Sequence, residues 1–366
     1  MKIILFANSD WYLYNYRLAF AKYLRTQGHE VFLLSPSGKY SSLLKAQGFQ
    51  WVPIEFSRDS MNFFSELSIV LKVRKVLKHI QPDVLHNFTL KSVLYGSLAA
   101  KHSGVKKVLN AITGKGYLFI NNNIQVNLVR KITAPLLRFA LRGSRVIFQN
   151  QEDLHFYVEN SFLLIEQTKL IYGSGVDTNK FFPSKYPPDE LNIILPSRLL
   201  KDKGIYEFVE AARIVRHDFP KINFVLVGNT DRGNPSSLSD EEIIKWQNDG
   251  IIKWWGWQHD MPLVYHRALL VCLPSYSEGL AKSLLEAAAC GVPIIATDIP
   301  GCREIVQHKK TGFLVPVHDA KALAESIIYA IKHPNLLAEM GKKGRELIIS
   351  SFSQENVISE TYKLYL

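Results

Sequence analysis

Two glutamates, Glu278 and Glu286, lie eight positions apart in the segment Pro274–Pro293, separated by a small-residue turn and the start of an apolar helix. The first N–H groups of such a helix have no partner inside it and carry partial positive charge, so they suit a diphosphate. Gly279 allows a ligand to approach the backbone closely. The segment therefore indicates a sugar-nucleotide pocket. Taken alone, it also fits a surface carboxylate near a helix start and one solvated glutamate.

Cations and glycines follow other strand-like runs of the C-terminal half. Arg198 and Lys203 come after the run Asn192–Ser197 and before a helix, where a guanidinium and an ammonium could hold a diphosphate leaving group. Two solvated cations are the alternative. Ligands of open parallel sheets lie beyond the carboxyl ends of the strands. The same position is expected for Gly228, for Gly256 with Trp257, and for the loop of Thr297–Gly301.

Length and composition indicate a folded protein of two domains. The chain has 366 residues, of which 47% are hydrophobic and 21% charged. It contains no run of 18 uncharged apolar residues, and its first residues, Met1–Phe6, predict a strand rather than a signal peptide, so we expect a cytoplasmic protein. The three cysteines, Cys272, Cys290 and Cys302, lack the spacing of a zinc site or a disulfide framework, and we expect reduced packing residues.

The positive charge lies in the first half. Residues 1–172 carry 22 Lys and Arg against 10 Asp and Glu, a net charge of +12, whereas residues 173–366 carry 22 against 23. Val84–Gln151 has ten basic residues and no acidic one, which predicts an anionic partner such as nucleic acid or a bilayer surface. Apolar and basic residues interleaved over Ile124–Leu141 favour the bilayer. A core helix with a solvated basic edge remains the alternative.

Strand-like runs alternate with helix-length segments along the whole chain, which predicts an α/β fold of two doubly wound parallel sheets. Helices are predicted over Tyr16–Gln27, Phe64–His79 and Tyr206–His217, and a proline-rich linker over Asp177–Asp189. The predicted strands are Ile3–Ala7, Val31–Ser35, Trp51–Ile54, Val84–His86, Lys107–Ala111, Val146–Gln149 and Lys169–Ile171, then Asn192–Ser197, Asn223–Val227, Ile251–Trp254, Leu269–Leu273, Pro293–Ala296 and Gly312–Val315.

Together these motifs resemble the retaining glycosyltransferases of the GT-B architecture, in glycosyltransferase family 4. The resemblance covers Gly173–Val315 and includes Arg198 with Lys201–Gly204, Glu278 with Glu286, and Ala289–Pro293. The first half resembles the subgroup that builds bacterial O-antigen, capsule or lipid-linked glycans, in the segments Trp11–Arg17, Asp83–Lys91 and Thr113–Tyr117.

The resemblance implies two Rossmann-like domains facing across a cleft. Residues 1–175 would form the acceptor and membrane-facing domain, residues 176–350 the nucleotide-sugar donor domain, and residues 351–366 a helix packing back toward the first domain.

The resemblance also implies roles for single residues. Arg198 and Lys203 would bind the diphosphate, Glu286 the ribose, and Glu278 with Gly279, Leu280, Ala281 and Lys282 the donor sugar. Gly228, Gly256 and Trp257 would complete the nucleotide site, and His86 would face the donor sugar, with a core histidine as the alternative. With Glu278, Arg198 and Lys203, His86 makes up the expected catalytic set. The expected acceptor residues are Asn8, Asp10, Tyr12, Arg17, Lys91, Thr113 and Lys115. Ala281 departs from the proline that relatives often have.

The implied reaction is transfer of a sugar with retention at the anomeric carbon, from a nucleoside diphosphate to a polyprenyl-diphosphate-linked glycan at the cytoplasmic face of an anionic membrane. No Asp-x-Asp triplet occurs, so we expect neither a metal nor another cofactor. The subgroup favours a UDP-sugar carrying an N-acetylhexosamine or a hexuronic acid, with GDP-mannose second. Two different functions also remain open, a sugar-nucleotide epimerase of the same architecture and a nucleic-acid-binding protein. The paired motifs disfavour the epimerase, and the lack of a recognised module disfavours nucleic acid.

Overall fold

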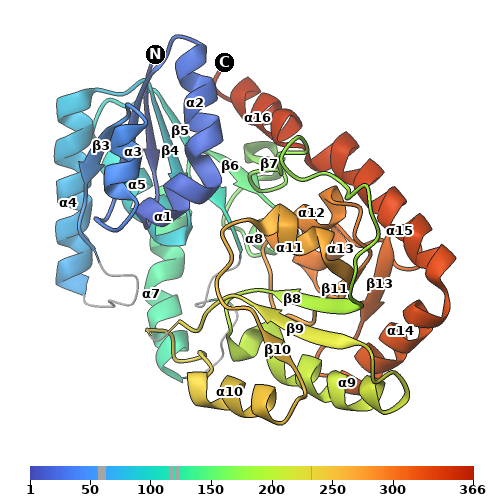
Figure 1. Cartoon of the computed structure of the whole chain (residues 1–366). Helices are drawn as coiled ribbons and strands as arrows, with labels where there is room; N and C mark the ends of the chain where they lie inside the picture. The colour runs from blue at the N-terminus through green and yellow to red at the C-terminus, as the bar shows by residue number, and fades with distance from the viewer. Residues whose placement is uncertain (57–62, 115–118, 120–123, 232) are drawn as a thin grey trace. The chain divides into compact units, whose positions relative to one another are not determined.

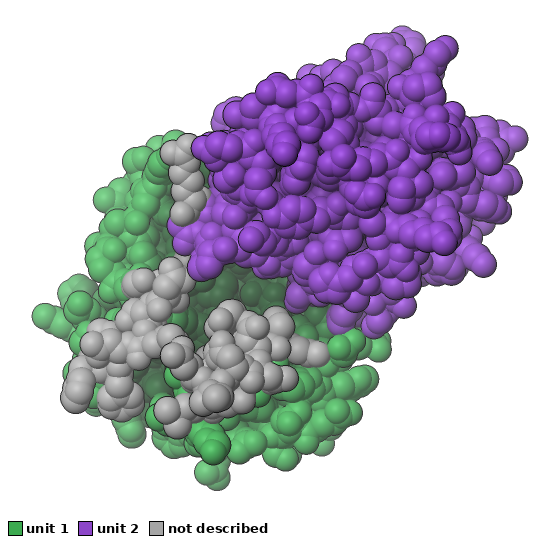
Figure 2. Space-filling model, turned by 90° about the horizontal axis from the view of Figure 1, so that it is seen from below, with its two compact units in different colours: residues 1–174, 358–366 green, residues 175–357 purple. Residues whose placement is uncertain are grey.

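In the computed structural model the chain forms two compact units, one of Met1–Ser174 with Ile358–Leu366 and the other of Gly175–Val357 (Figures 1 and 2). Residues 1–56, 63–114, 119, 124–231 and 233–366 are described. The sequence predicts the first boundary at 175/176 and a separate C-terminal segment at 351–366. In the structure, residues 358–366 belong to the first unit.

The first unit contains a seven-stranded parallel sheet in the order β3-β2-β1-β4-β5-β6-β7. The residues of its central strands β1 and β4 are buried on both faces and are mostly apolar, as parallel sheets covered by helices require. Because β1 lies between β2 and β4, the chain winds outward in both directions from the β1–β4 pair. The strands are β1 (Lys2–Phe6), β2 (Glu30–Ser35), β3 (Gln50–Pro53), β4 (Val84–Phe88), β5 (Lys107–Ile112), β6 (Arg145–Phe148) and β7 (Thr168–Leu170).

Helix α5 packs against α4 and against α7 in this unit. Ile69, Val73 and Leu77 of α4 lie in one apolar cluster with Ile4 and Leu85 of the sheet, and α7 contributes to a second. The helices are α1 (Asp10–Tyr12), α2 (Leu18–Thr26), α3 (Ser41–Ala46), α4 (Phe63–Ile80), α5 (Leu90–Ala100), α7 (Ile124–Leu141) and α8 (Gln151–Glu159), with a π-helical turn over Leu13–Arg17 and a 3₁₀ turn over Ile165–Gln167. The helix predicted over Tyr16–Gln27 is thus divided between the π-helical turn and α2.

The end of the chain returns to the first unit. Helix α16 (Gln354–Lys363) leads to the last residues, where the Tyr362 hydroxyl lies 2.9 Å from Nε2 of His29 and Lys107 Nζ donates to the Tyr365 carbonyl oxygen at 2.9 Å. Tyr365 is almost completely buried. These contacts attach the C-terminal residues to the sheet that begins the chain.

The second unit repeats the architecture with six parallel strands in the order β10-β9-β8-β11-β12-β13. The strands are β8 (Asn192–Pro196), β9 (Asn223–Val227), β10 (Lys253–Trp254), β11 (Ala268–Leu273), β12 (Ile294–Thr297) and β13 (Gly312–Val315). The helices are α9 (Ile205–Asp218), α10 (Asp240–Asn248), α11 (Met261–His266), α12 (Lys282–Ala289), α13 (Pro300–Arg303), α14 (Ala320–Lys332) and α15 (Pro334–Leu347), with a 3₁₀ turn over Lys201–Lys203 and a π-helical turn over Ile348–Phe352.

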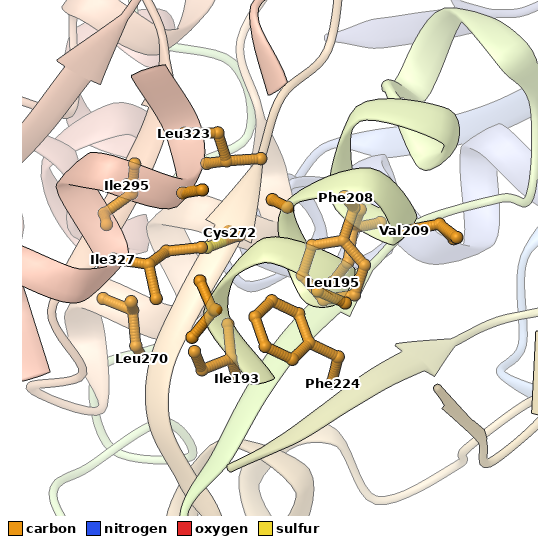
Figure 3. Packing of buried hydrophobic residues seen from close by; sticks show 14 of the residues in the cluster. Ile193, Leu195, Phe208, Val209, Phe224, Leu270, Cys272, Ile295, Leu323 and Ile327 are labelled. Carbon is orange, nitrogen blue, oxygen red and sulfur yellow. The ribbon is translucent and has the colours of Figure 1, made fainter. Parts of the chain in front are cut away.

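Helices α9 and α14 cover one face of this sheet (Figure 3). Ile193 and Leu195 alternate along β8 and meet Phe208 of α9, while Leu270 and Cys272 of β11 lie in the same cluster. Each such side chain contributes about 1.5–3 kcal/mol on burial. This core makes the strands a rigid base for the loops at their carboxyl ends.

Every strand predicted from the sequence is present, and the predicted fold class is confirmed. All three cysteines are free and buried, as expected.

Candidate functional site

The middle of the second sheet is a point where the winding direction reverses. β8 pairs with β11, while β9 and β10 lie on one side and β12 and β13 on the other. The connections that leave β8 and β11 therefore run in opposite directions, which opens a crevice at the carboxyl ends where ligands of such sheets bind. The loops of residues 197–204 and 274–281 begin there.

Backbone contacts hold these two loops together. Tyr276 N–H and the Ser275 hydroxyl both donate to the Asp202 carbonyl oxygen, at 2.8 and 3.1 Å. Gly204 has φ +70°, and a Cβ at this position would lie 2.0 Å from the Pro274 carbonyl oxygen. Only glycine meets both conditions. The glycine of the Lys201–Gly204 motif thus sets the distance between the loops.

An ion pair joins the same loops. Lys203 Nζ lies 2.5 Å from Glu278 Oε1, with 17% and 14% of the two side chains exposed. The start of α13, which follows β12, lies close to the backbone of Glu278, since a Cβ on Gly301 would lie 2.5 Å from the Glu278 carbonyl oxygen. Burial, followed by the charge of Glu278, raises the pKa of the neighbouring Cys302 thiol well above its usual value. A cation and a carboxylate, both mostly buried, therefore lie at the carboxyl edge of β8 and β11.

Glu286 lies in the second turn of α12, on a side chain that is only 13% exposed. Its Oε2 lies 3.1 Å from the Tyr265 hydroxyl and its Oε1 lies 3.9 Å from Lys282 Nζ. Burial raises the pKa of Glu286, and the Lys282 charge and the Tyr265 hydrogen bond oppose this rise. The carboxylate is thus oriented by a buried phenol and an ammonium one helical turn earlier.

The start of α12 lies between the two glutamates. The helix begins at Lys282, and its N-cap residue Ala281 provides no side-chain cap. Ala281 is buried and its N–H donates to the Gly301 carbonyl oxygen at 3.3 Å, while Gly279 and Leu280 are half-buried. An alanine at position 281 is accommodated without loss of the helix start.

Arg198 forms its ion pair with a different carboxylate from the one that pairs with Lys203. It is 55% exposed and Nη1 lies 2.9 Å from Asp231 Oδ2, on the loop after β9. No sequence pattern indicates Asp231, because an acidic residue in a loop of Asp, Asn, Gly and Ser residues gives no distinct signal.

The glycines of the expected nucleotide site have a backbone role in this region. Gly228 N–H donates to the Gly256 carbonyl oxygen at 2.9 Å, and a Cβ on Gly228 would lie 1.9 Å from the Ser197 carbonyl oxygen. These contacts fix the loops after β8, β9 and β10 against one another. Trp257 beside them is 51% exposed.

His86 lies inside the first unit on β4 and is 1% exposed. Nδ1 lies 2.7 Å from the Tyr365 hydroxyl, and Nε2 has no hydrogen-bond partner among the described residues. Burial and then the charge of Arg17 lower the pKa of the imidazole well below its usual value. His86 is thus packed as a core histidine within the first unit, and its contact with a donor sugar stays a prediction. No sequence pattern indicates its partner Tyr365, which lies 279 residues further along the chain.

Asp10, Tyr12 and Arg17, three of the expected acceptor residues, make contacts within the first unit. Asp10 is buried, and its Oδ2 accepts hydrogen bonds from Tyr40 N–H and the Ser41 hydroxyl at 2.8 and 2.9 Å. Arg17 is also buried and donates to the Tyr12 hydroxyl at 2.7 Å and to the Gly173 carbonyl oxygen at 3.1 Å. Asp10 and Arg17 therefore stabilise the loop after β1.

Lys91, Asn8 and Thr113 follow strands of the first sheet. Lys91 Nζ lies 3.3 Å from Glu66 Oε1 across α4 and α5. Asn8 and Thr113 are half-buried in the loops after β1 and β5, and Lys115 lies outside the described residues.

Metal ligands and membrane-spanning helices are both absent from the part of the chain that the structure describes. No three His, Cys, Asp or Glu side chains are grouped there as metal ligands. None of the helices of these residues combines the length and the hydropathy needed to span a membrane.

Two family models match the chain, one in each half. The model described as glycosyl transferases group 1 matches residues 176–347, and the model described as glycosyl transferase 4-like matches residues 2–151. The first includes Arg198, Lys203, Glu278 and Glu286.

Similar proteins of known name are glycosyltransferases. The N,N'-diacetylbacillosaminyl-diphospho-undecaprenol alpha-1,3-N-acetylgalactosaminyltransferase of Campylobacter jejuni is 30% identical over 380 residues, covering all of this chain and 98% of the relative. The UDP-Gal:alpha-D-GlcNAc-diphosphoundecaprenol alpha-1,3-galactosyltransferase of Escherichia coli is 24% identical over 84% of this chain and 81% of its own length.

Solved structures agree on the fold. Anabaena HepE in complex with UDP superposes with a TM-score of 0.81 at 19% identity, over 99% of each chain. A Rickettsia africae glycosyltransferase superposes with a TM-score of 0.80 at 21% identity, over all of this chain and 97% of the other. The full-length match at 30% identity, the two family models and the shared fold place this chain in the group 1, family 4-like glycosyltransferases of GT-B architecture.

Proposed function

We propose that this glycosyltransferase moves a sugar from a UDP-sugar to a saccharide carried on undecaprenyl diphosphate, with retention at the anomeric carbon. The names of the relatives support the acceptor, since the Campylobacter and Escherichia coli enzymes both act on diphosphoundecaprenol-linked sugars. The Escherichia coli name also includes a UDP-sugar, and an N-acetylhexosamine or a hexuronic acid is the transferred sugar we favour. The site of action would then be the cytoplasmic face of the cell membrane.

The observation that carries this proposal is the Lys203–Glu278 ion pair. It lies in the second unit, at the carboxyl ends of β8 and β11, where the winding direction of the sheet reverses. Departure of a nucleoside diphosphate develops negative charge, and preorganised positive groups lower the barrier to it. Lys203 and the start of α12 would provide that stabilisation without a metal, and Arg198 would bind the outer part of the diphosphate. Lys203 would then exchange the Glu278 carboxylate for a phosphate oxygen.

Glu278 and Glu286 would have different tasks. Released from Lys203, Glu278 would accept hydrogen bonds from the sugar hydroxyls, and the backbone of Gly279–Lys282 would also contact the sugar. Glu286, oriented by Tyr265, would accept them from the ribose hydroxyls. In the proposed reaction the acceptor hydroxyl attacks on the face from which the diphosphate leaves, and Glu278 orients the sugar without acting as a nucleophile.

A thermal-shift panel of UDP, GDP and dTDP with their common sugar conjugates, run in EDTA, tests the donor site. A ligand at about 100 times its dissociation constant raises the free energy of unfolding by about 2.7 kcal/mol. We expect UDP compounds to stabilise the wild type and Glu325→Ala, but not Glu286→Ala. Glu325 is a matched control because its Oε1 also lies 3.9 Å from a lysine, Lys321, at the i,i+4 spacing, on an exposed helix face.

A product assay completes the test. We expect sugar transfer to a synthetic polyprenyl-diphosphate saccharide, with the α-anomer formed from an α-linked donor. Conversion of the donor to another sugar nucleotide without acceptor would indicate an epimerase, and stabilisation by GDP compounds alone would indicate a GDP-sugar donor. Either result would refute the proposal as stated.

A further inference from the structure

The exposed face of α7 carries cations and apolar side chains together. Lys131, Ile132, Pro135, Arg138 and Phe139 follow one another at spacings that keep them on one side of the helix, and Arg142 comes directly after its last residue. Ile132 and Phe139 are 57% and 52% exposed, whereas Leu137 and Leu141 on the other side are fully buried in the core. Ile132 and Phe139, which lie on one side of the helix and are rimmed by basic side chains, form an apolar patch of the kind that marks an interaction site.

A cavity of about 530 Å³ lies beside the C-terminal end of this face. Arg138 and Arg142 form one wall, and Val158 with residues 161–167 forms the rest. Phe162 and Leu163 are buried beneath it, while Leu164 and Ile165 are 68% and 51% exposed. The cavity therefore combines an apolar wall with two guanidinium groups.

The two arginines differ in how they are held. Arg138 Nη2 donates to the Asn160 carbonyl oxygen at 2.9 Å, and its guanidinium carbon lies 5.0 Å from the Phe162 ring centroid. Within the described residues no carboxylate pairs with Arg138 or Arg142. Burial, and then the charge of Arg142, lowers the pKa of the nearby Lys101 amine, whose Nζ lies 5.4 Å from the Phe139 ring centroid.

One acidic residue lines the cavity. Glu166 is exposed, and its carbonyl oxygen, not its carboxylate, accepts a hydrogen bond from Arg145 at 2.7 Å. The negative charge of this carboxylate would weaken binding of an anion. This gives the inference a test in which one substitution should strengthen binding.

We propose that the exposed face of α7, the cavity at Arg138 and Arg142, and the rim of Leu164 and Ile165 together dock the protein on an anionic phospholipid bilayer, with one headgroup phosphate entering the cavity. This α7 surface binds phosphate through planar guanidinium groups, which match its oxygens in pairs. Exposed Leu164 and Ile165 enter the interfacial region of the bilayer. The apolar rim favours a bilayer over nucleic acid or a soluble anion, because neither of these would cover it.

The inference rests on the lipid-linked acceptor of the proposed function, but its experiment requires no catalysis. The full-length protein is sedimented with phosphatidylcholine vesicles, with and without phosphatidylglycerol, at low and high salt. We expect binding only to the phosphatidylglycerol vesicles, weakened by salt, because screening reduces exposed electrostatic attraction. Failure to bind these vesicles at low salt would overturn the docking proposal and leave the glycosyl transfer reaction standing.

Removing a positive charge and removing a negative charge should change vesicle binding in opposite directions. One basic residue near an anionic surface contributes about 1 kcal/mol, a factor of about five in binding. We expect Arg142→Gln to weaken vesicle binding about fivefold and Glu166→Gln to strengthen it by a similar factor. The double variant Leu164→Ser/Ile165→Ser should weaken binding further at every salt concentration.

Matched controls lie in the other unit. Lys342→Gln on α15 removes an exposed cation, and Leu263→Ser on α11 removes a side chain that is 56% exposed. Both should bind vesicles like the wild type. If Arg142→Gln and Lys342→Gln weakened vesicle binding equally, only the net charge would matter, and the proposal that the α7 surface docks on the bilayer would be overturned. Tight binding of inorganic phosphate without vesicle binding would overturn it in favour of a soluble ligand.

Discussion

Gly204 offers a direct test of how the loops after β8 and β11 are held together. Its φ of +70° costs an alanine about 1–2 kcal/mol. The added Cβ would also lie 2.0 Å from the Pro274 carbonyl oxygen, a backbone atom that cannot rotate away. Forced overpacking costs about 1–3 kcal/mol more. We therefore expect Gly204→Ala to lower the free energy of unfolding by about 3 kcal/mol, or about 6–12 °C in Tm for a unit of this size.

Gly250 provides the matched control. Its φ is +68°, nearly the same as that of Gly204, but no atom lies within 4 Å of the Cβ that alanine would add. Gly250→Ala therefore carries the backbone strain alone, about 1–2 kcal/mol and a few degrees in Tm. The difference between the two variants isolates the contact with Pro274.

The assay is calorimetric unfolding of both variants at one pH, followed by titration with UDP. Gly204→Ala must displace either Lys203 or the loop that carries Glu278, so UDP affinity should fall in this variant and stay at the wild-type level in Gly250→Ala. Equal losses of Tm would refute the reasoning, because the close approach to Pro274 would then contribute nothing. An unchanged UDP affinity in Gly204→Ala would show that the loop spacing does not matter for the nucleotide.

Three further predictions concern the candidate site residues. Lys203→Met should cost about 3 kcal/mol in urea unfolding because it leaves the mostly buried Glu278 carboxylate unpaired, and Lys203→Met/Glu278→Gln should cost less; costs that simply add would mean no coupling. The lowered pKa of His86 means that the unfolded state binds the extra proton below about pH 6.5, so stability falls on acidification by up to about 1.4 kcal/mol per pH unit, and His86→Gln should flatten this part of the Tm profile; a flat wild-type profile between about pH 7 and 5 would contradict it. Transfer activity should persist in EDTA because Lys203, Arg198 and the start of α12 supply the positive charge, whereas a loss reversed by Mg²⁺ would count against a metal-free site.

The strands could be predicted because a parallel sheet covered on both faces leaves continuous aliphatic runs in the sequence. Because the strands are parallel, the loops that follow them all lie at the same edge of the sheet. Lys203 and Glu278 follow strands separated by 71 residues along the chain, from Pro196 to Ala268, yet β8 and β11 are adjacent in the sheet. Their proximity depends on this strand order, which was not predicted from the sequence; the pattern predicted only that both loops lie at the carboxyl edge of the sheet.

Contacts that depend on side-chain packing between distant segments could not be predicted from the sequence. His86 is hydrogen-bonded to Tyr365, and Arg198 forms an ion pair with Asp231. Tyr365 lies in the C-terminal segment and Asp231 in a loop, and neither segment has a periodic pattern that predicts the contact. The cavity beside α7 likewise depends on how residues 161–167 turn after α8. Charge counting located the basic region but could not distinguish cations that bind structural carbonyl oxygens, such as Arg145, from cations available to a ligand.

Lys203 is paired with Glu278 before any donor binds, and this pairing would affect donor recognition. A diphosphate that takes Lys203 from Glu278 leaves a carboxylate only 14% exposed, and an unsatisfied buried group of this kind costs about 1–3 kcal/mol. Sugar hydroxyls can satisfy that carboxylate, whereas a nucleoside diphosphate without a sugar cannot. The same ion pair that neutralises the site before binding would therefore favour the intact donor over the product by about tenfold, since about 1.4 kcal/mol is a factor of ten. Recognition of the phosphates and recognition of the sugar would then be one coupled exchange of partners at the carboxyl ends of β8 and β11.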